Sequence, residues 1–171
     1  MPRALKEETP MNRQSLVQES IAQLLLEMPN LHDRRYGYVH LFGVSAFAAL
    51  LAMRRGLNVE LAGVAGLLHD IATYTSGSSE DHARRSARQA RQILDDIGVF
   101  SPAEVDAIGT AIANHSNKSE VQDPLSELLK DADVLQHSLY AATIIDSSVR
   151  LPRIEALCAE LSLTWPGMTA S

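Results

Sequence analysis

The sequence predicts an all-α fold, a single-domain bundle of about six or seven helices. Apolar residues recur at steps of three and four along successive segments, which is the period of a helix with one buried face. Helix start and stop signals separate these segments. No stretch of useful length alternates apolar and polar residues as a half-buried strand does, and there is no internal repeat or low-complexity block.

The first helix is expected to open at Ser15. Ser15 and Gln18 have the spacing of a capping box, in which each side chain satisfies a backbone N–H at the start of the helix. Met28-Pro29-Asn30 ends this helix. Residues 1–13 are polar and contain two prolines, so we expect a mobile N-terminal segment followed by one folded domain over residues 14–165.

Two apolar helices are expected next. The first runs from about residue 38 to residue 54 and stops at Gly56, because glycine readily adopts the left-handed conformation that ends a helix. In the second, apolar residues recur from Leu57 to Ile71, which makes "GLLHDIATY" at residues 66–74 its C-terminal part. Since that helix is apolar nearly all round, we expect it to be buried.

The second half of the chain predicts four more helices. The loop "TSGSSED" precedes the first of them, which ends at Gly98. Ser101-Pro102-Ala103-Glu104 combines a cap, a proline at the first helical position and a capping-box glutamate, and so predicts the start of the next. We expect these helices at about residues 83–97, 102–115, 123–145 and 152–161.

The composition is that of a soluble globular protein, with 46% hydrophobic and 21% charged residues. The one cysteine, Cys158, cannot form an internal disulfide, which suits a reducing compartment. The N-terminus has no apolar core of a signal peptide, and no stretch is expected to approach 18 uncharged apolar residues. We therefore expect a cytoplasmic protein without a membrane partner.

The net charge of −6 argues against a DNA or RNA groove, since binding to the phosphate backbone usually requires a basic patch. Four arginines do line one predicted helix, and their spacing is typical of a solvated helix face. These are Arg84, Arg85, Arg88 and Arg91.

The tripeptide Leu-His-Asp occurs twice, and its two copies differ in context. At residues 31–33 it follows Met28-Pro29-Asn30, with no apolar helix upstream, so we expect His32 and Asp33 in a solvated loop. His69 and Asp70 lie instead on the buried apolar helix. Burying an unpaired charge there would cost several kcal/mol. The second copy is therefore predicted to be functional.

A divalent ion would remove that cost, because imidazole nitrogen and carboxylate oxygen are ligands of such metals. His40 heads the apolar stripe of its helix, and His115 ends another apolar stripe. Each histidine alone is more often a hydrogen-bonded core residue. Asp133 adds a carboxylate on a late helix, so His40, His69, Asp70 and Asp133 are predicted to converge on one ion.

With these residues in place, the chain resembles the HD-domain superfamily of metal-dependent phosphohydrolases, whose pattern is His, then His-Asp, then a distant Asp. The resemblance extends from about residue 34 to residue 140 and rests on five stretches in order. They are "YGYVHLFGV" with His40, "AGLLHDIA" with His69 and Asp70, "DHARRSA" with His82, "IANHSNK" with His115 and "LLKDADVLQH" with Asp133.

The resemblance implies a hydrolase that uses metal-activated water, with one or two divalent ions of Mn, Fe, Mg, Co, Ni or Zn. Asp70 is expected to bind metal and to accept a hydrogen bond from the attacking water. His82 and His115 would either hold a second metal or act as catalytic acids that protonate the leaving oxygen.

Further residues receive supporting roles. Lys118, Arg34 and Arg35 are candidates for pairing with a substrate phosphate, although a solvated surface position fits each of them equally well. His137 is expected to line the pocket or to support a metal ligand from behind. In "KDAD", the resemblance implies that Asp133 faces the metal, because Ala132-Asp133-Val134-Leu135 matches the family motif Ala-Asp-x-Leu. Two residues apart on a helix differ by about 200°, so both aspartates cannot face one ion. Asp131 is then left to solvent or to a supporting role.

The resemblance favours a small phosphomonoester or nucleotide as the substrate. The alternative is a sensor module that has the same fold and holds metal or a nucleotide without turnover. The complete ligand set favours the enzyme.

Overall fold

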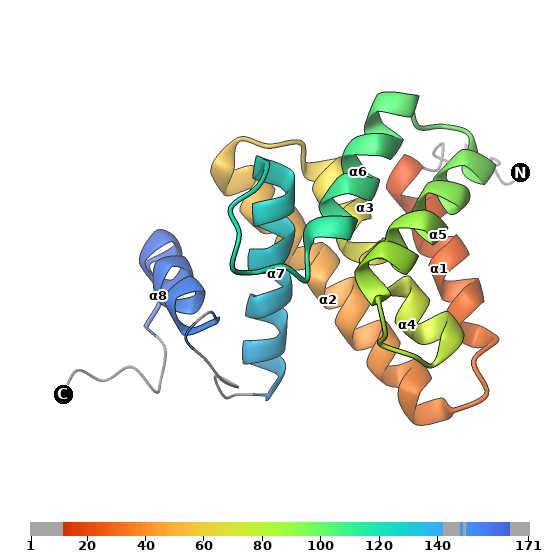
Figure 1. Cartoon of the computed structure of the whole chain (residues 1–171), viewed down its shortest axis with the longest axis horizontal. Coiled ribbons are helices and arrows are strands. Elements are labelled where there is room, and N and C mark those ends of the chain that lie inside the picture. Colours follow the sequence, from red (N-terminus) through yellow and green to blue (C-terminus); the bar gives the residue numbers. More distant parts are fainter. Residues whose placement is uncertain (1–11, 142–147, 149, 165–171) are drawn as a thin grey trace, which may run out of the picture.

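The computed structural model describes residues 12–141, 148 and 150–164, and within this part of the chain every regular element is a helix. The expected all-α fold is confirmed. Eight helices follow one another along the described residues (Figure 1): α1 Arg13–Leu26, α2 Leu31–Arg55, α3 Val59–Leu68, α4 Ile71–Ser76, α5 His82–Ile97, α6 Pro102–Asn114, α7 Pro124–Ala141 and α8 Arg150–Leu161.

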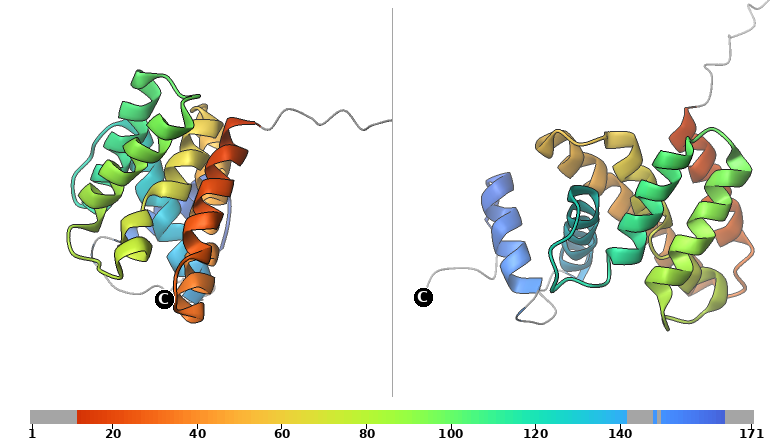
Figure 2. Two further views of the ribbon diagram at one scale, coloured as in Figure 1. Left: turned by 90° about the vertical axis from the view of Figure 1, so that its right-hand side faces the viewer. Right: turned by 45° about the horizontal axis from the view of Figure 1, so that its top comes forward.

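Helix α2 is the centre of the packing. It lies against α3 along one side and against α7 along another, while α5 and α6 pair with each other and α6 contacts both α3 and α7. The views in Figures 1 and 2 show α8 beside α7 at one edge of the molecule and α1 at the other. Fully buried aliphatic side chains from these central helices, including Val44, Leu67, Ile108 and Leu128, form the core.

The start of α1 differs from the expectation. Asn12 caps the helix, and its side-chain Oδ1 accepts a hydrogen bond from the backbone N–H of Ser15 at 2.8 Å. Ser15 therefore lies inside the first turn, because the asparagine upstream already satisfies the free N–H groups. The segment expected to be mobile lies outside the described residues from 1 to 11, whereas Arg13 is helical.

Helix α2 also begins earlier than expected, at Leu31. The side chain of Asn30 caps it by accepting hydrogen bonds from the backbone N–H groups of His32 at 2.9 Å and Asp33 at 3.5 Å. The expectation that the first Leu-His-Asp lies in a connecting loop was wrong, since Asn30 starts a helix there. Its end at Gly56, in the left-handed conformation with φ 67°, is confirmed.

The buried helix that was expected to continue through "GLLHDIATY" is broken at its ionisable pair. Helix α3 ends at Leu68, and Asp70 leaves helical geometry with φ −119° and ψ 15° before α4 begins. This break is why the described part of the chain has eight helices and not the six or seven expected. It also puts His69 and Asp70 at helix ends, where side chains can leave the regular face of the helix.

The later boundaries follow their local signals. Gly98 ends α5 with φ 72°, and both hydrogen bonds of the capping box between Ser101 and Glu104 are present at the start of α6. Helix α8 begins two residues before Pro152. The expected end of α7 near residue 145 lies outside the described residues.

The expectation that no stretch approaches membrane-spanning length was wrong. Among the described residues, α2 is the one helix long and apolar enough to cross a membrane, with a mean hydropathy of 1.5 over its best 18-residue window. Of that window, 44% is buried, and core helices pass the same test. Because α2 packs against α3 and α7, this is weak evidence for a membrane span. The cytoplasmic location stays a prediction.

Candidate metal centre

Four ligand atoms from different parts of the fold converge next to α2. His40 Nε2 lies 3.1 Å from His69 Nε2, 3.5 Å from Asp70 Oδ2 and 3.7 Å from Asp133 Oδ1. His69 Nε2 lies 3.6 Å and 3.8 Å from the same two carboxylate oxygens. Ligands about 2.0–2.2 Å from one ion are themselves about 3–3.5 Å apart, so the group has nearly the dimensions of a coordination sphere.

The orientation of each imidazole points its free nitrogen at this position. His40 Nδ1 lies 2.7 Å from the side-chain oxygen of Gln136, and His69 Nδ1 lies 2.8 Å from the backbone oxygen of Gly66. Both oxygens accept hydrogen bonds only, so each Nδ1 donates and leaves a lone pair on Nε2. Two lone pairs face each other across 3.1 Å, an arrangement that a cation or a proton between them must stabilise.

Burial and neighbouring charges together decide the protonation of these groups. Desolvation lowers the pKa of His69 to about 3, so its imidazole is neutral and able to bind metal. Burial alone would raise the pKa of Asp133, but the charge of Lys118 and the nearby imidazoles outweigh it and hold that pKa well below its usual range. For His40, burial is outweighed in the same way by Asp70 and Asp133, and its pKa is raised. A metal ion and a proton on His40 therefore compete for one position.

Two buried carboxylate oxygens of the site have no hydrogen-bond donor. Asp70 Oδ1 and Asp133 Oδ1 are buried and accept no hydrogen bond. A buried carboxylate oxygen that accepts no hydrogen bond is costly, whereas a divalent cation beside it would satisfy it. The residues present therefore fit a divalent metal.

A second group of ligand atoms shares Asp70. Its Oδ1 lies 3.3 Å from His115 Nε2 and 3.5 Å from His82 Nε2, and the three residues form a separate metal-compatible cluster. Backbone carbonyls again hold the other ring nitrogens, at 2.7 Å for His115 and 3.0 Å for His82. Asp70 therefore presents one oxygen to each cluster, as required of a carboxylate that bridges two ions.

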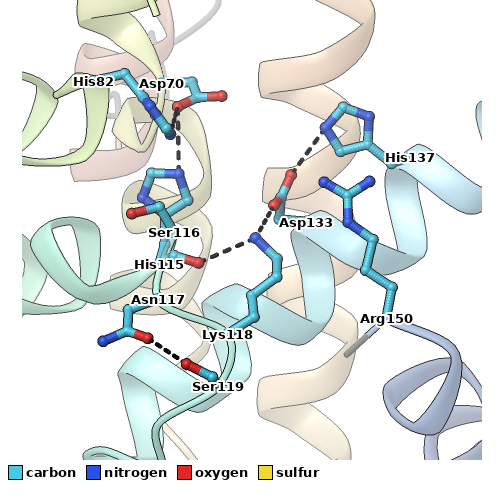
Figure 3. Close-up of a pocket in the computed structure, with 10 residues that line it drawn as sticks. All are labelled: Asp70, His82, His115, Ser116, Asn117, Lys118, Ser119, Asp133, His137 and Arg150. Atoms are coloured by element: carbon cyan, nitrogen blue, oxygen red, sulfur yellow. Dashed lines mark hydrogen bonds and ion pairs between the residues drawn. The ribbon is translucent and has the colours of Figure 1, made fainter. Parts of the chain in front are cut away.

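A pocket of about 440 Å³ opens onto both clusters. Figure 3 shows the ammonium group of Lys118 beside Asp133 and the backbone of His115; its Nζ lies 2.8 Å from Asp133 Oδ2 and donates to the backbone oxygen of His115 at 3.1 Å. Arg150 extends into the pocket from α8 towards His137 (Figure 3). The pocket therefore places cations beside the candidate metal ligands.

The two phosphate candidates upstream of His40 are not brought to this pocket. Arg34 donates a hydrogen bond to the backbone oxygen of Met28, in the connection between α1 and α2, and Arg35 is exposed. Among the described residues, neither lines the pocket. His32 and Asp33 are likewise exposed and lie outside it.

The two aspartates of "KDAD" point to different neighbours. Asp133 faces the histidines, and His137 Nε2 lies 3.3 Å from its Oδ1, with the His137 ring 4.6 Å from that of His40. Asp131 instead forms ion pairs with Arg55 at 2.8 Å and Arg153 at 2.7 Å. Asp131 therefore ties α7 to α2 and α8.

Sequence reasoning missed two contributors. Gln136 fixes the orientation of His40, and Arg150 enters the pocket from another helix. Gln136 directly precedes His137, which was a weak signal. Nothing in the sequence around Arg150 links it to the histidines, because only the packing of α8 against α7 brings it near.

A family model described as HD domain matches residues 37–145. Ribonuclease Y of Chlorobium luteolum is 28% identical over 128 residues, and ribonuclease Y of Chlorobium phaeovibrioides is 31% identical over 128 residues. Each alignment covers 73% of this chain and 22% of the relative, so the chain spans about a fifth of the length of these curated relatives. No solved structure gives a significant match. Because the family model covers more than half of the chain and includes the convergent histidines and aspartates, the protein belongs to the HD domain family.

Proposed function

We propose that this protein is a metal-dependent phosphohydrolase that acts on a small phosphomonoester or a nucleotide. The observation that carries the proposal is the pair of buried carboxylate oxygens, Asp70 Oδ1 and Asp133 Oδ1, which accept no hydrogen bond and lie beside imidazoles with free Nε2 atoms. The HD domain family supports a metal-dependent hydrolase, and the relatives' name, ribonuclease Y, supports a phosphate ester as the bond that is cleaved.

The residues of the proposed site fall into metal ligands and residues that orient the attacking water. His40, His69, Asp70 and Asp133 would hold one divalent ion, and Asp70, His82 and His115 would hold a second. Bound metal would supply Lewis acidity and lower the pKa of water. The carboxylate of Asp70 accepts a hydrogen bond from the attacking water and so orients it toward phosphorus.

The remaining residues receive the substrate and the leaving group. Lys118 and Arg150 would pair with phosphate oxygens and offset the charge that develops on them. In hydrolysis, the water oxygen bonds to phosphorus, the bond to the leaving oxygen breaks, and that oxygen takes up a proton. With one ion bound instead of two, His82, whose side chain is 29% exposed, would deliver this proton rather than bind metal.

The test is phosphate release by the purified chain from a panel of nucleotides and phosphomonoesters, with Mn²⁺, Mg²⁺, Fe²⁺, Co²⁺, Ni²⁺ or Zn²⁺ added one at a time. The proposal expects turnover with at least one metal and none for Asp133→Ala. No turnover with any metal, together with a nucleotide that raises the melting temperature, would show that the chain is a sensor module instead.

A further inference from the structure

A second pocket adjoins the metal pocket. It also measures about 440 Å³, within the usual range for small-molecule sites. Ser116 and Asn117 line both pockets, so the two meet at this part of the loop between α6 and α7. We call the second one the side pocket. Its far wall includes Arg84 from α5, and Gln122 closes it from the end of the loop.

Arg84 differs from Arg85 and Arg91 of the same helix. Arg85 donates to the backbone oxygens of Ser78 and Glu80, and Arg91 pairs with Asp106 at 3.1 Å. Arg84 is exposed, lines the side pocket and has no hydrogen bond or ion pair with any residue in the described ranges. Its guanidinium is therefore available to an anionic ligand.

The amide side chains of the side pocket offer both donors and acceptors. The side-chain oxygen of Gln122 is buried and has no hydrogen-bond partner among the described residues. Asn117 accepts from Ser119 at 3.0 Å, which leaves its NH₂ group as a donor. Asn114 uses its NH₂ group on Ser126 at 3.1 Å, which leaves its carbonyl oxygen as an acceptor.

This mixture selects the kind of ligand. A phosphate group offers only acceptors, so it would suit Arg84 but would repel the carbonyl oxygen of Gln122 and the carboxylate of Asp81. A nucleoside carries ribose hydroxyls and base edges, which donate as well as accept. One cation and several amide groups therefore match a nucleotide unit better than a chain of phosphates.

Building on the proposed function, we propose that the side pocket binds the nucleotide adjacent to the scissile phosphate, with Arg84 pairing with its phosphate. The hydrolase would then accept, besides single nucleotides, an oligonucleotide end of at least two nucleotides, cleaved at a phosphodiester. Water bonds to phosphorus at the metal pocket, the bond to the ribose oxygen breaks, and that oxygen takes the proton. A contact to one or two phosphates agrees with a net charge of −6, which disfavours a long basic groove.

The experiment measures equilibrium binding by calorimetry in the presence of Mn²⁺. The probes are a 5′-phosphorylated dinucleotide with a hydrolysis-resistant phosphorothioate link, the matching nucleoside 5′-monophosphorothioate and a nucleoside triphosphate. The variants are Arg84→Gln, Gln122→Leu and, as the matched control, Arg88→Gln. Arg88 is also exposed and lies one turn along the same helix, but it does not line the side pocket.

Arg84→Gln is expected to weaken dinucleotide binding about tenfold, the lower end of the range for a hydrogen bond to a charged group. Monophosphorothioate binding should change less than twofold, and Arg88→Gln should change neither. Equal effects of Arg84→Gln and Arg88→Gln would overturn the assignment. An effect of Arg84→Gln on the triphosphate but not on the dinucleotide would overturn the nucleotide as occupant.

The failure of this inference is distinguishable from that of the proposed function. If the wild type hydrolyses nucleotides, but Arg84→Gln and Gln122→Leu bind the dinucleotide as tightly as the wild type does, the side pocket is rejected and the hydrolase is kept. Absence of all hydrolysis, with dinucleotide binding still weakened by Arg84→Gln, rejects the hydrolase and keeps the side pocket as a binding site.

Discussion

At the scale of single residues, every imidazole of the two clusters is held by an oxygen atom at Nδ1. The oxygen is a backbone carbonyl for His69, His82 and His115 and a side-chain amide for His40. These partners fix the tautomer and the ring orientation before any ligand binds. The cost of ordering a metal site is therefore met during folding.

The two copies of Leu-His-Asp predict opposite mutational outcomes. His69→Ala and Asp70→Ala should each remove bound metal and reduce hydrolysis to background, because both residues supply ligand atoms to the cluster. His32→Ala and Asp33→Ala should leave metal content and rate near wild type, since both side chains are exposed. Elemental analysis of the four purified variants is the measurement. Loss of metal in His32→Ala would contradict the assignment of the metal site to the second Leu-His-Asp.

The two aspartates of α7 predict a separation of metal binding from stability. Asp133→Asn should lose metal, whereas Asp131→Asn should keep it. Asp131→Asn should lower the free energy of unfolding by about 1–3 kcal/mol, because it weakens ion pairs with Arg55 and Arg153. Metal content and urea denaturation of both variants test this. The reverse pattern, with metal lost only from Asp131→Asn, would show that Asp131 and not Asp133 is the metal ligand.

At the scale of secondary-structure elements, helix ends supply most of the candidate ligands. His69 and Asp70 lie in the break between α3 and α4, His82 is the first residue of α5, and His115 follows the last residue of α6. Side chains at such positions can leave the regular helical face, so residues on different helices reach one point. His40 and Asp133 lie inside α2 and α7 and close the first cluster from the other side.

Removing the second cluster should change the metal stoichiometry. The double variant His82→Ala/His115→Ala leaves only the Asp70 carboxylate of that group, so we expect a fall from two bound ions to one. Elemental analysis of wild type and double variant measures this. One ion in both proteins, with substrate binding alone reduced, would instead assign both histidines to contacts with phosphate.

The distance between α2 and α3 depends on Gly66. A Cβ atom built there would lie 2.6 Å from the backbone Cα of Ser45, whereas one on Gly63 would meet only the flexible end of Gln14, at 2.8 Å. Gly66→Ala should therefore destabilise the fold by about 1–3 kcal/mol, and Gly63→Ala should be nearly neutral. Thermal unfolding and metal content compare the two variants on one helix. Equal melting temperatures for both would contradict the close approach.

At the scale of the whole molecule, Arg13 joins the start of α1 to two other helices. Its guanidinium pairs with Glu60 in α3 and with Glu104 in α6, the latter at 3.1 Å. It also lies 4.7 Å above the ring of Phe100. The N-terminal helix thus holds α3 and α6 together, and α6 leads directly to His115.

The pairing predicts a pH dependence of stability. The hydrogen bond from Arg13 lowers the pKa of Glu104 from 4.5 to about 2. Because the pKa of Glu104 is depressed in the folded state, its ion pair with Arg13 stabilises the fold fully above pH 4.5. This stabilisation is lost as the pH falls towards 2. The difference in melting temperature between wild type and Glu104→Gln should be constant from pH 7 to 4.5 and then shrink. Asp106→Asn, which removes an exposed ion pair with Arg91, serves as the control. If the difference in melting temperature between wild type and Glu104→Gln stayed unchanged down to pH 2, the prediction would be contradicted.

The sequence by itself determined most of the helices and the order of the candidate ligands. Caps and stops such as Gly56, Gly98 and the Ser101–Glu104 box act within one turn, and apolar periodicity reports which face is buried, so both are readable locally. The choice of Asp133 over Asp131 could also be predicted, because Asp133 matches the family motif and two positions apart on one helix cannot face the same point.

Only the tertiary structure decided which distant groups share the site. The break at His69-Asp70 goes against a strong apolar period, and the packing of α2, α6 and α7 around it turns Asp70 towards both clusters. Arg34 was as plausible as Lys118 in the sequence, but Arg34 binds the connection between α1 and α2, while the loop after α6 brings Lys118 to Asp133. Such contacts join residues far apart in the chain, and no local pattern encodes them.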